Sequence, residues 1–190
     1  MPNPELQRIN AFLSGFARRQ AGHIVDLPGG FAVYDDAYAH SRANNQVVID
    51  AVVDAEALPA LAEEALGHLP HRLISVLDHA GGMACVGPLV RAAYTHSTHL
   101  VMLHAGPAPT SKPADEVDLD AIRAPLTRRR RRLLPDVDNE VVRHLVDRHE
   151  ARRGGAEIVR FLGARTEEGR SPHGPTSTWT QGPAWRRSRI

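Results

Sequence analysis

Short apolar runs alternate with helix-periodic segments over residues 31–105, and this alternation constrains the fold more than any other feature of the sequence. The runs FAVYDDAYA (31–39) and QVVIDAVV (46–53) are β-branched or aromatic and are separated by the polar stretch HSRANN, which predicts two strands joined by a loop. RLISVLD (72–78) and THLVMLHA (98–105) predict two further strands. Strands that alternate with helices imply a sheet with covering helices.

Three helices are expected in the same region, each from apolar residues at helical spacing. The face of the first consists of Leu6, Ile9, Leu13 and Phe16. The face of the second consists of Leu58, Leu61, Ala62, Ala65 and Leu66. Asp54 can cap this second helix, and Pro59 is tolerated only in its first turns. AGGMACVGPLVRAAY (80–94) predicts a third helix, which Gly87-Pro88 interrupts or delays.

A proline-rich stretch, AGPAPTSKPAD (105–115), predicts a linker that divides the chain. Beyond it, EVDL (116–119) and EIVRFLGA (157–164) predict strands, and residues 122–133 and 140–152 predict helices. We therefore expect an α/β (α+β) protein with a mixed sheet and covering helices. Its domains are an N-terminal lobe (1–105), a linker (106–115), a β-α-α-β segment (116–168) and a tail (169–190) without periodicity, which we expect to be disordered.

The composition excludes several classes of protein. Hydrophobic residues make up 42% and charged residues 24% of the 190, as in soluble globular proteins, and no apolar run is long enough to span a bilayer. The 23 basic and 22 acidic residues give no overall reason to expect nucleic acid or a membrane as partner. With one cysteine and no signal peptide at the N-terminus, we expect a cytoplasmic location.

The run Arg128–Arg132 is the densest group of charges and raises the question of phosphate or nucleic-acid binding. Ile122, Leu126 and Leu133 mark an apolar stripe on the same predicted helix, and Arg129 falls into it. We expect at least one of these arginines to lay its aliphatic stem along the core and to reach outward with its charge. Because the net charge is only +1 and aromatic residues are not interleaved with the arginines, we do not expect specific nucleic-acid binding.

The eleven histidines suggest no metal site. His144 and His149 are five residues apart, which turns them to different faces of a helix, and His96 and His99 would point to opposite faces of a strand. His149 shares its helix stripe with apolar residues, so we expect it to be packed rather than to bind a metal. We therefore predict no metal ligands.

Other reactive residue types have structural interpretations. Cys85 lies among apolar residues, which indicates a buried, unreactive thiol. AGGM (80–83) lacks the pattern of a phosphate-binding loop, so its glycines are expected to start or cap a helix. The adjacent acids Asp35-Asp36 and Glu63-Glu64 point apart or into solvent, and we assign them no acid–base role. The sequence thus identifies no catalytic residue and no cofactor-binding residue.

The segment EVDLDAIRAPLTRRRRRLLPDVDNEVVRHLVDRHEARRGGAEIVRFLGAR (116–165) resembles the β-α-α-β opening of a GNAT-family acetyltransferase, of an actinobacterial type with an extra N-terminal lobe. GGFAVYDDAYAHSRANNQVVID (29–50) and AAYTHSTHLVML (92–103) are similar to segments of that lobe. The resemblance covers most of residues 20–168 and contains no catalytic motif. It implies acetyl transfer from acetyl-CoA to an amine of a small molecule or peptide.

In that family two further strands follow, similar to ASWADLYL and VAQIEDV, and then a glycine-rich turn of the form Arg/Gln-x-x-Gly-x-Gly/Ala. The backbone N–H groups of this turn hold the acetyl-CoA pyrophosphate at a helix N-terminus. The residues after Gly163 contain neither the strands nor the turn. The resemblance therefore implies an incomplete acetyltransferase domain, in which we expect no tight binding of acetyl-CoA and no activity.

The tail itself points to the missing strands. One permitted codon spelling of residues 170–190, read from the third base of its first codon, encodes VASWADLYLDPGPGVAQIED. The synonymous third bases are chosen, but the second and third bases of most shifted codons are fixed by the protein. The unusual AGA and AGG codons needed at Arg187 and Arg189 are the weakest points of this spelling. We infer a frameshift near Gly169, in the gene or in its recorded sequence.

Two other functions compete with this interpretation. The N-terminal lobe could be a non-catalytic module that binds a small molecule or protein, and Arg128–Arg132 with the Arg-rich end could belong to a basic nucleic-acid-binding protein. A half-sheet would leave an open edge and apolar helix faces exposed, so we also expect marginal stability or self-association through that edge.

Overall fold

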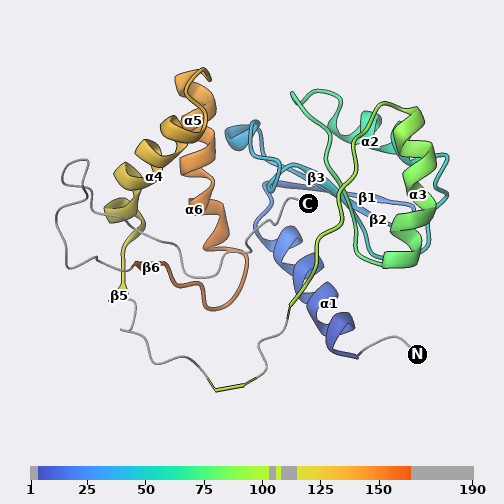
Figure 1. Cartoon of the computed structure of the whole chain (residues 1–190), viewed down its shortest axis with the longest axis horizontal. Coiled ribbons are helices and arrows are strands. Elements are labelled where there is room, and N and C mark those ends of the chain that lie inside the picture. The colour runs from blue at the N-terminus through green and yellow to red at the C-terminus, as the bar shows by residue number, and fades with distance from the viewer. Residues whose placement is uncertain (1–3, 103–105, 108–114, 164–190) are drawn as a thin grey trace. The chain divides into compact units, whose positions relative to one another are not determined.

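The structure is a computed structural model that describes residues 4–102, 106–107 and 115–163 (Figure 1). Among these, the residues up to His96 and those in Asp136–Val159 form one compact unit, unit 1. The residues in Ser97–Pro135 and those from Arg160 onward form unit 2. Within the described ranges no helix is both long and apolar enough to cross a membrane.

Unit 1 contains a mixed four-stranded sheet in the order β1-β2-β3-β4. The strands are β1 (His23–Leu27), β2 (Gly30–Tyr34), β3 (Gln46–Ile49) and β4 (Ile74–Val76). The pairs β1–β2 and β2–β3 are antiparallel, and β4 runs parallel to β3. Strands form within each of the predicted segments 31–39, 46–53 and 72–78, but they are shorter than expected, and Asp36–Tyr38 form a 3₁₀ helix instead of the end of a strand. The strand β1 was not expected.

A two-residue turn joins β1 to β2, because Leu27 pairs directly with Gly30. Pro28 has its φ fixed near about −65° by its ring. Gly29 takes φ +76°, so the pair meets the requirement of a type II turn for positive φ at its second central residue. The strand β1 that this turn adds is an edge strand, because it stands first in the sheet order and pairs with β2 alone.

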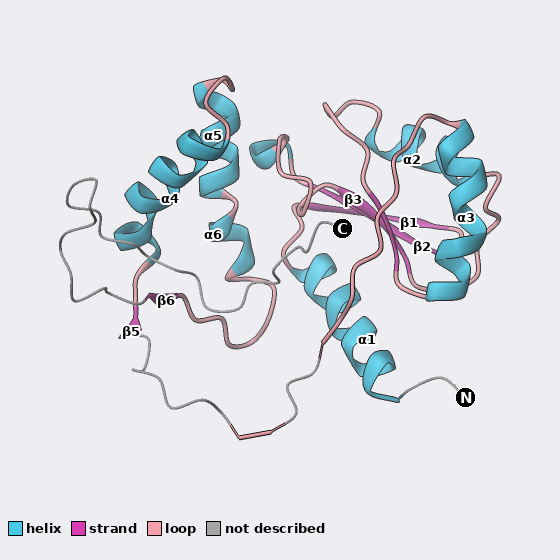
Figure 2. Cartoon of the chain, viewed as in Figure 1, coloured by secondary structure: helices cyan, strands magenta, loops and turns pink. Residues whose placement is uncertain are grey.

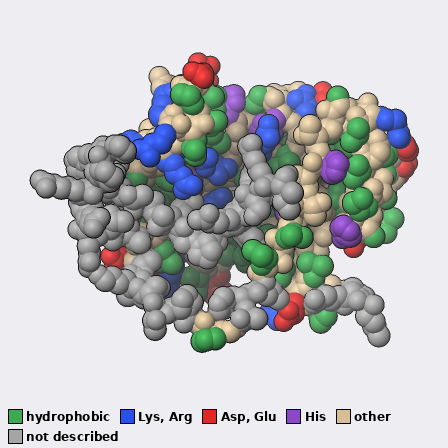
Figure 3. Space-filling model, in the orientation of Figure 1, with side chains coloured by type: hydrophobic (Ala, Val, Ile, Leu, Met, Phe, Trp, Pro, Cys, Tyr) green, Lys and Arg blue, Asp and Glu red, His purple; other side chains and the backbone are tan. Residues whose placement is uncertain are grey.

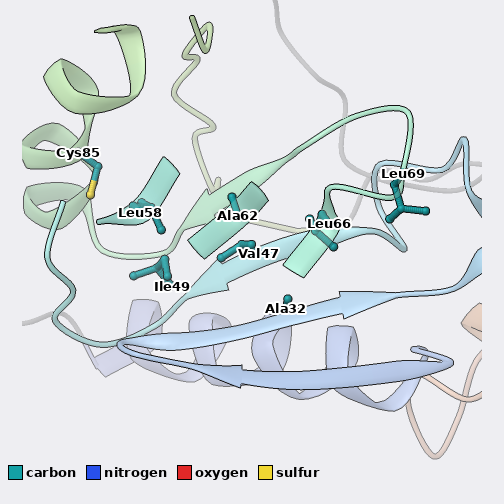
Figure 4. Packing of buried hydrophobic residues seen from close by; sticks show 8 residues of the cluster. All are labelled: Ala32, Val47, Ile49, Leu58, Ala62, Leu66, Leu69 and Cys85. Atoms are coloured by element: carbon teal, nitrogen blue, oxygen red, sulfur yellow. The ribbon is translucent and has the colours of Figure 1, made fainter. Parts of the chain in front are cut away.

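The two faces of the sheet carry separate cores, because side chains alternate along each strand. On one face, Phe31, Val33 and Val48 pack with Ala17 of α1 (Pro4–Arg19). The other face is covered by α2 (Leu58–Leu66) and α3 (His79–Arg91), as Figure 2 shows. The core on that side consists of Ala32, Val47, Ile49, Leu58, Ala62, Leu66, Leu69 and Cys85 (Figure 4). The expectation of a mixed sheet with covering helices is thus confirmed.

The helix α3 differs from its prediction at Gly87-Pro88. It continues through Pro88 to Arg91 without interruption. Cys85 and Leu89, on either side of the proline, both pack against the core under the sheet. Their burial stabilises the helical course and offsets the hydrogen bond that proline cannot donate.

Two short helices close to each other in sequence complete unit 1. They are α5 (Asn139–Asp147) and α6 (His149–Arg152), and α5 packs against the 3₁₀ helix η1 (Asp36–Tyr38). One continuous helix over 140–152 was expected, but Arg148 lies between two helices as a turn residue. Its backbone keeps helical angles, and its N–H bonds the His144 carbonyl at 3.1 Å, so the break is a local one.

Unit 2 contains α4 (Leu119–Leu133) and a minimal antiparallel pair, β5 (Asp115–Glu116) with β6 (Leu162–Gly163). The strands expected over 116–119 and 157–164 are therefore only two residues long each. Arg160 Nε lies 3.8 Å from Glu116 Oε2 beside this pair. Leu119, Ile122 and Leu126 form the buried side of α4.

One predicted strand is wrong over its described part. Residues 98–102 form no strand, and 103–105 lie outside the described residues. Leu100 and Met102 are 76% and 83% exposed, so these apolar side chains make no sheet face. An apolar run becomes a strand only where a neighbouring strand pairs with it.

The domain boundaries drawn from the sequence stay a prediction. The structure groups Asp136–Val159 with unit 1, although these residues follow the predicted linker. The predicted tail 169–190 and most of the predicted linker lie outside the described residues.

Candidate functional site

The arginine run lies in the last turns of α4, where cationic side chains are favoured by the helix dipole. Arg129 is exposed rather than aligned with the buried stripe, and Leu133 is 58% exposed. The expected stripe is wrong at these two positions. The buried series Leu119, Ile122, Leu126 continues at Arg130, which is half-buried, because the stripe advances by four residues there.

The sequence offered two histidine pairs as candidate metal ligands, His96 with His99 and His144 with His149. His96 and His99 are exposed in the irregular segment after α3, and Figure 3 shows several histidines at the surface of the molecule. His149 is buried, with Nδ1 2.8 Å from the Val146 carbonyl oxygen, which confirms that it is packed. In the part of the chain that the structure describes, no three His, Cys, Asp or Glu side chains are grouped as a metal would require.

Cys85 and the acidic residues that the sequence offered as reactive groups take part in packing or in structural hydrogen bonds. Cys85 is buried in the core of Figure 4, and burial raises the pKa of its thiol, so the unreactive protonated form is favoured. Asp35 caps η1 by accepting a hydrogen bond from the Ala37 N–H at 3.0 Å. Glu63 accepts two hydrogen bonds from Arg72, at 2.7 and 2.9 Å, and these lower the pKa of Glu63.

An aspartate precedes each of the two helices α2 and α3 that cover the parallel strands. Before α2, Asp54 Oδ1 accepts a hydrogen bond from the Glu56 N–H at 3.0 Å. Before α3, Asp78 Oδ2 accepts one from the Gly81 N–H at 2.7 Å, so the glycines of AGGM do start a helix as expected. A helix N-terminus attracts anions through such N–H groups. At α3 the Asp78 carboxylate already takes that place. At α2 the N-cap residue is Ala57 and no side chain caps the helix, so the expected cap by Asp54 is wrong: its carboxylate bonds the turn that precedes the helix.

A cluster of buried polar side chains in unit 1 was missed by the sequence reasoning. It comes from the loop HSRANN between β2 and β3, which reads as an ordinary exposed loop. Ser41, Asn44 and Asn45 are nevertheless 0%, 1% and 0% exposed. We define the polar cluster as His40, Ser41, Asn44, Asn45, His144 and Arg148.

Asn45 fixes the shape of this loop. Its Nδ2 donates to the Tyr38 and Ser41 carbonyl oxygens at 2.8 and 3.0 Å, and its Oδ1 accepts from the Asp35 N–H at 2.7 Å. One amide side chain thus satisfies backbone groups on both sides of η1. Buried backbone groups without a partner are costly, which explains why an asparagine is useful here.

Ser41 joins the loop to the α5–α6 segment. Its hydroxyl donates to Asn44 Oδ1 at 2.7 Å and accepts from Arg148 Nη1 at 3.2 Å. A nucleophilic serine needs a base that takes its proton. Because the Ser41 proton is directed to an amide oxygen, this geometry serves to fasten two segments of unit 1 rather than to activate a nucleophile.

His144 belongs to the same cluster and is buried. Its Nδ1 lies 3.4 Å from the His40 backbone N–H, and its Nε2 lies 2.9 Å from Arg143 Nη2. Burial lowers the pKa of His144 most, and the Arg143 and His40 charges lower it further. Glu140 and Asp147 act in the opposite direction. His144 is therefore held as a neutral imidazole at neutral pH.

A second histidine, His71, lies close enough to the loop to interact with its residues. Burial is the largest cause that lowers the pKa of His71, followed by Arg42. A hydrogen bond with the Asn45 backbone raises it, and His40 and Arg72 lower it. Its Nε2 is buried and makes no hydrogen bond among the described residues. His71 therefore also favours the neutral form.

Comparison of the chain with protein-family models, with curated proteins and with solved structures finds no match.

Proposed function

We propose that this chain derives from an acetyl-CoA-dependent N-acetyltransferase of the GNAT family, and that its 190 residues do not carry out acetyl transfer. The acceptor of the parent enzyme would be an amine of a small molecule or peptide. The observation that carries the proposal is the alternate reading of residues 170–190 as VASWADLYLDPGPGVAQIED.

The constraint on that reading is strong because each shifted codon takes two of its three bases from the next residue of the printed chain. Those are the first two bases of a codon, which the amino acid fixes for most residues. Only a few amino acids are then accessible at each shifted position. A run that resembles both missing strands, in the order of the family, is hard to obtain by choosing third bases alone.

The mixed sheet of unit 1 is consistent with the resemblance of the N-terminal lobe. The strands β3 and β4 are parallel and are joined through α2, so they form a β-α-β unit in which the helix begins near the end of a strand. The expectation that the chain holds no acetyl-CoA tightly rests on the residues after Gly163, which contain no Arg/Gln-x-x-Gly-x-Gly/Ala turn.

The proposed frameshift is tested by sequencing the DNA around codon 169. We expect the alternate frame to encode the peptide above and to continue into an Arg/Gln-x-x-Gly-x-Gly/Ala turn. The proposal is overturned if the alternate frame encodes a different peptide.

Activity is tested separately by titrating acetyl-CoA into the purified chain in a calorimeter. We expect no binding heat from the printed chain, because positioning of the thioester depends on the absent turn. A version with one base added at codon 170, which restores the frame, is expected to bind acetyl-CoA. Tight binding of acetyl-CoA by the 190-residue chain would overturn the proposal that this chain is inactive, but not the proposal that it derives from a GNAT-family acetyltransferase.

A further inference from the structure

Both ring nitrogens of His144 face N–H donors. The His40 backbone N–H lies 3.4 Å from Nδ1, and the Arg143 guanidinium lies 2.9 Å from Nε2. A neutral imidazole has one nitrogen that can accept a hydrogen bond, but an imidazolium has none. Protonation would therefore set an N–H of the ring against a donor on each side, in a side chain that is only 6% exposed.

The charges around His144 do not compensate for this. On α5 itself, Arg143 opposes a positive ring, while Glu140 and Asp147 favour one. Glu140 Oε1 is 3.7 Å from Nε2, but its side chain is 65% exposed, so water screens the attraction. Opposite α5, the His40 ring centroid lies 5.2 Å from that of His144. Two imidazolium rings at that separation would repel each other.

The other ionisable groups nearby are already engaged. On η1, Asp36 Oδ1 is 3.5 Å from His68 Nε2. Next to α5, Arg148 donates to Ser41, and on α6 His149 bonds the Val146 carbonyl. Around His71, which interacts with the same loop, Arg42, Arg72 and His40 are all basic. The described surroundings of the contact thus contain more basic than acidic groups.

We propose that His144 forms a pH-sensitive contact that holds α5 against the loop 40–45 and η1, and that mild acid releases α5 from this contact. At neutral pH the His144 ring in this contact is uncharged, so α5 and the loop meet through a neutral side chain. When α5 leaves, the ring becomes exposed to water and regains an ordinary tendency to bind a proton. Protonation therefore favours the released state.

The direction follows from proton linkage. In the docked state the pKa of His144 is lowered, so the released state binds protons first as the pH falls. Docking is fully favoured above the ordinary histidine pKa of about 6.5 and weakens below it, until the docked ring itself protonates. At pH 5.5 a released ring is mostly protonated, which favours release by up to about tenfold relative to pH 7.5.

Hydrogen exchange of the full chain tests this, with protection factors corrected for the intrinsic effect of pH on exchange. Between pH 7.5 and pH 5.5 we expect the amides of α5 to lose protection by up to about tenfold, while those of β2 and β3 lose less. His144→Asn keeps an oxygen that can accept from the His40 N–H but removes the titration. Its α5 protection is expected to be independent of pH over this range.

His79→Asn is the matched control, because His79 is exposed in α3. It should retain the wild-type response. The proposal is overturned if wild-type α5 keeps its full protection at pH 5.5, or if His144→Asn loses as much as the wild type. Should that variant not fold, an NMR titration of His144 in the wild type tests the proposal instead. A pKa of His144 at or above the ordinary histidine value would contradict the pH-sensitive contact.

Discussion

At the scale of single residues, the loop between β2 and β3 depends on side-chain amides more than on apolar contacts. Asn45 and Asn44 are both buried, and each bonds another part of the same loop. Such bonds replace those that the loop backbone would otherwise make with water. The α5–α6 segment packs on a surface that these amides shape.

Asn45→Ala should destabilise the protein. It leaves the Tyr38 and Ser41 carbonyls and the Asp35 N–H without this partner, and we expect a loss of about 2 to 4 kcal/mol in the free energy of unfolding. Urea denaturation followed by circular dichroism measures it. Asn139→Ala, at an exposed position in α5, is the control and should change stability by less than about 0.5 kcal/mol. Equal effects of the two substitutions would contradict this role of Asn45.

At the scale of elements, tertiary packing changed several predicted boundaries. The helix α3 extends through Pro88 because Cys85 and Leu89 reach the core, while the predicted strand at 98–102 does not form. The strand β1 was not predicted, because HIVDL is only five residues long and its apolar residues do not alternate with polar ones. Its formation depends on the Pro28-Gly29 turn.

Gly29→Ala tests that turn. At φ +76° a side chain is strained, and an added Cβ would lie 2.7 Å from the Val52 carbonyl oxygen. We expect a loss of about 1 to 3 kcal/mol in the free energy of unfolding, measured by thermal or urea denaturation. The control is Gly82→Ala in α3, where the nearest atom would be 3.8 Å away. It should be neutral or stabilising, and a destabilising Gly82→Ala with a silent Gly29→Ala would refute the assignment.

At the scale of the whole molecule, an exposed edge strand remains among the described residues. β1 pairs with β2 on one side and lies at the end of the sheet order. It carries Ile24 and Val25, which are 46% and 39% exposed. Apolar edge strands are templates for pairing with another chain.

We therefore expect the protein to self-associate as its concentration rises, and Val25→Lys to reduce this association. A lysine on an edge strand opposes pairing by its charge. Sedimentation velocity over a range of concentrations measures the effect. Val52→Lys changes a 97% exposed valine outside the sheet and should associate like the wild type. If Val25→Lys associates as strongly as the wild type, β1 is not the surface involved.

The sequence was sufficient where a physical signal repeats along the chain. Apolar periodicity predicted α1, α2, β2, β3 and β4, and it indicated the buried positions of Cys85 and His149. Periodicity works because a helix or strand that covers a core must place apolar residues on one side. The resemblance of 116–165 and the alternate frame of 170–190 rest on the sequence alone and stay predictions.

Only the tertiary structure decided the polar cluster and the grouping of Asp136–Val159 with the N-terminal residues. Ser41 and His144 are polar, so no pattern of hydrophobicity marks them as buried. Each is buried because a partner arrives from far along the chain: the His40 N–H and His144 Nδ1 are 104 residues apart in sequence. Polar residues become interior residues when folding supplies their hydrogen-bond partners, and that supply is a property of three-dimensional contacts.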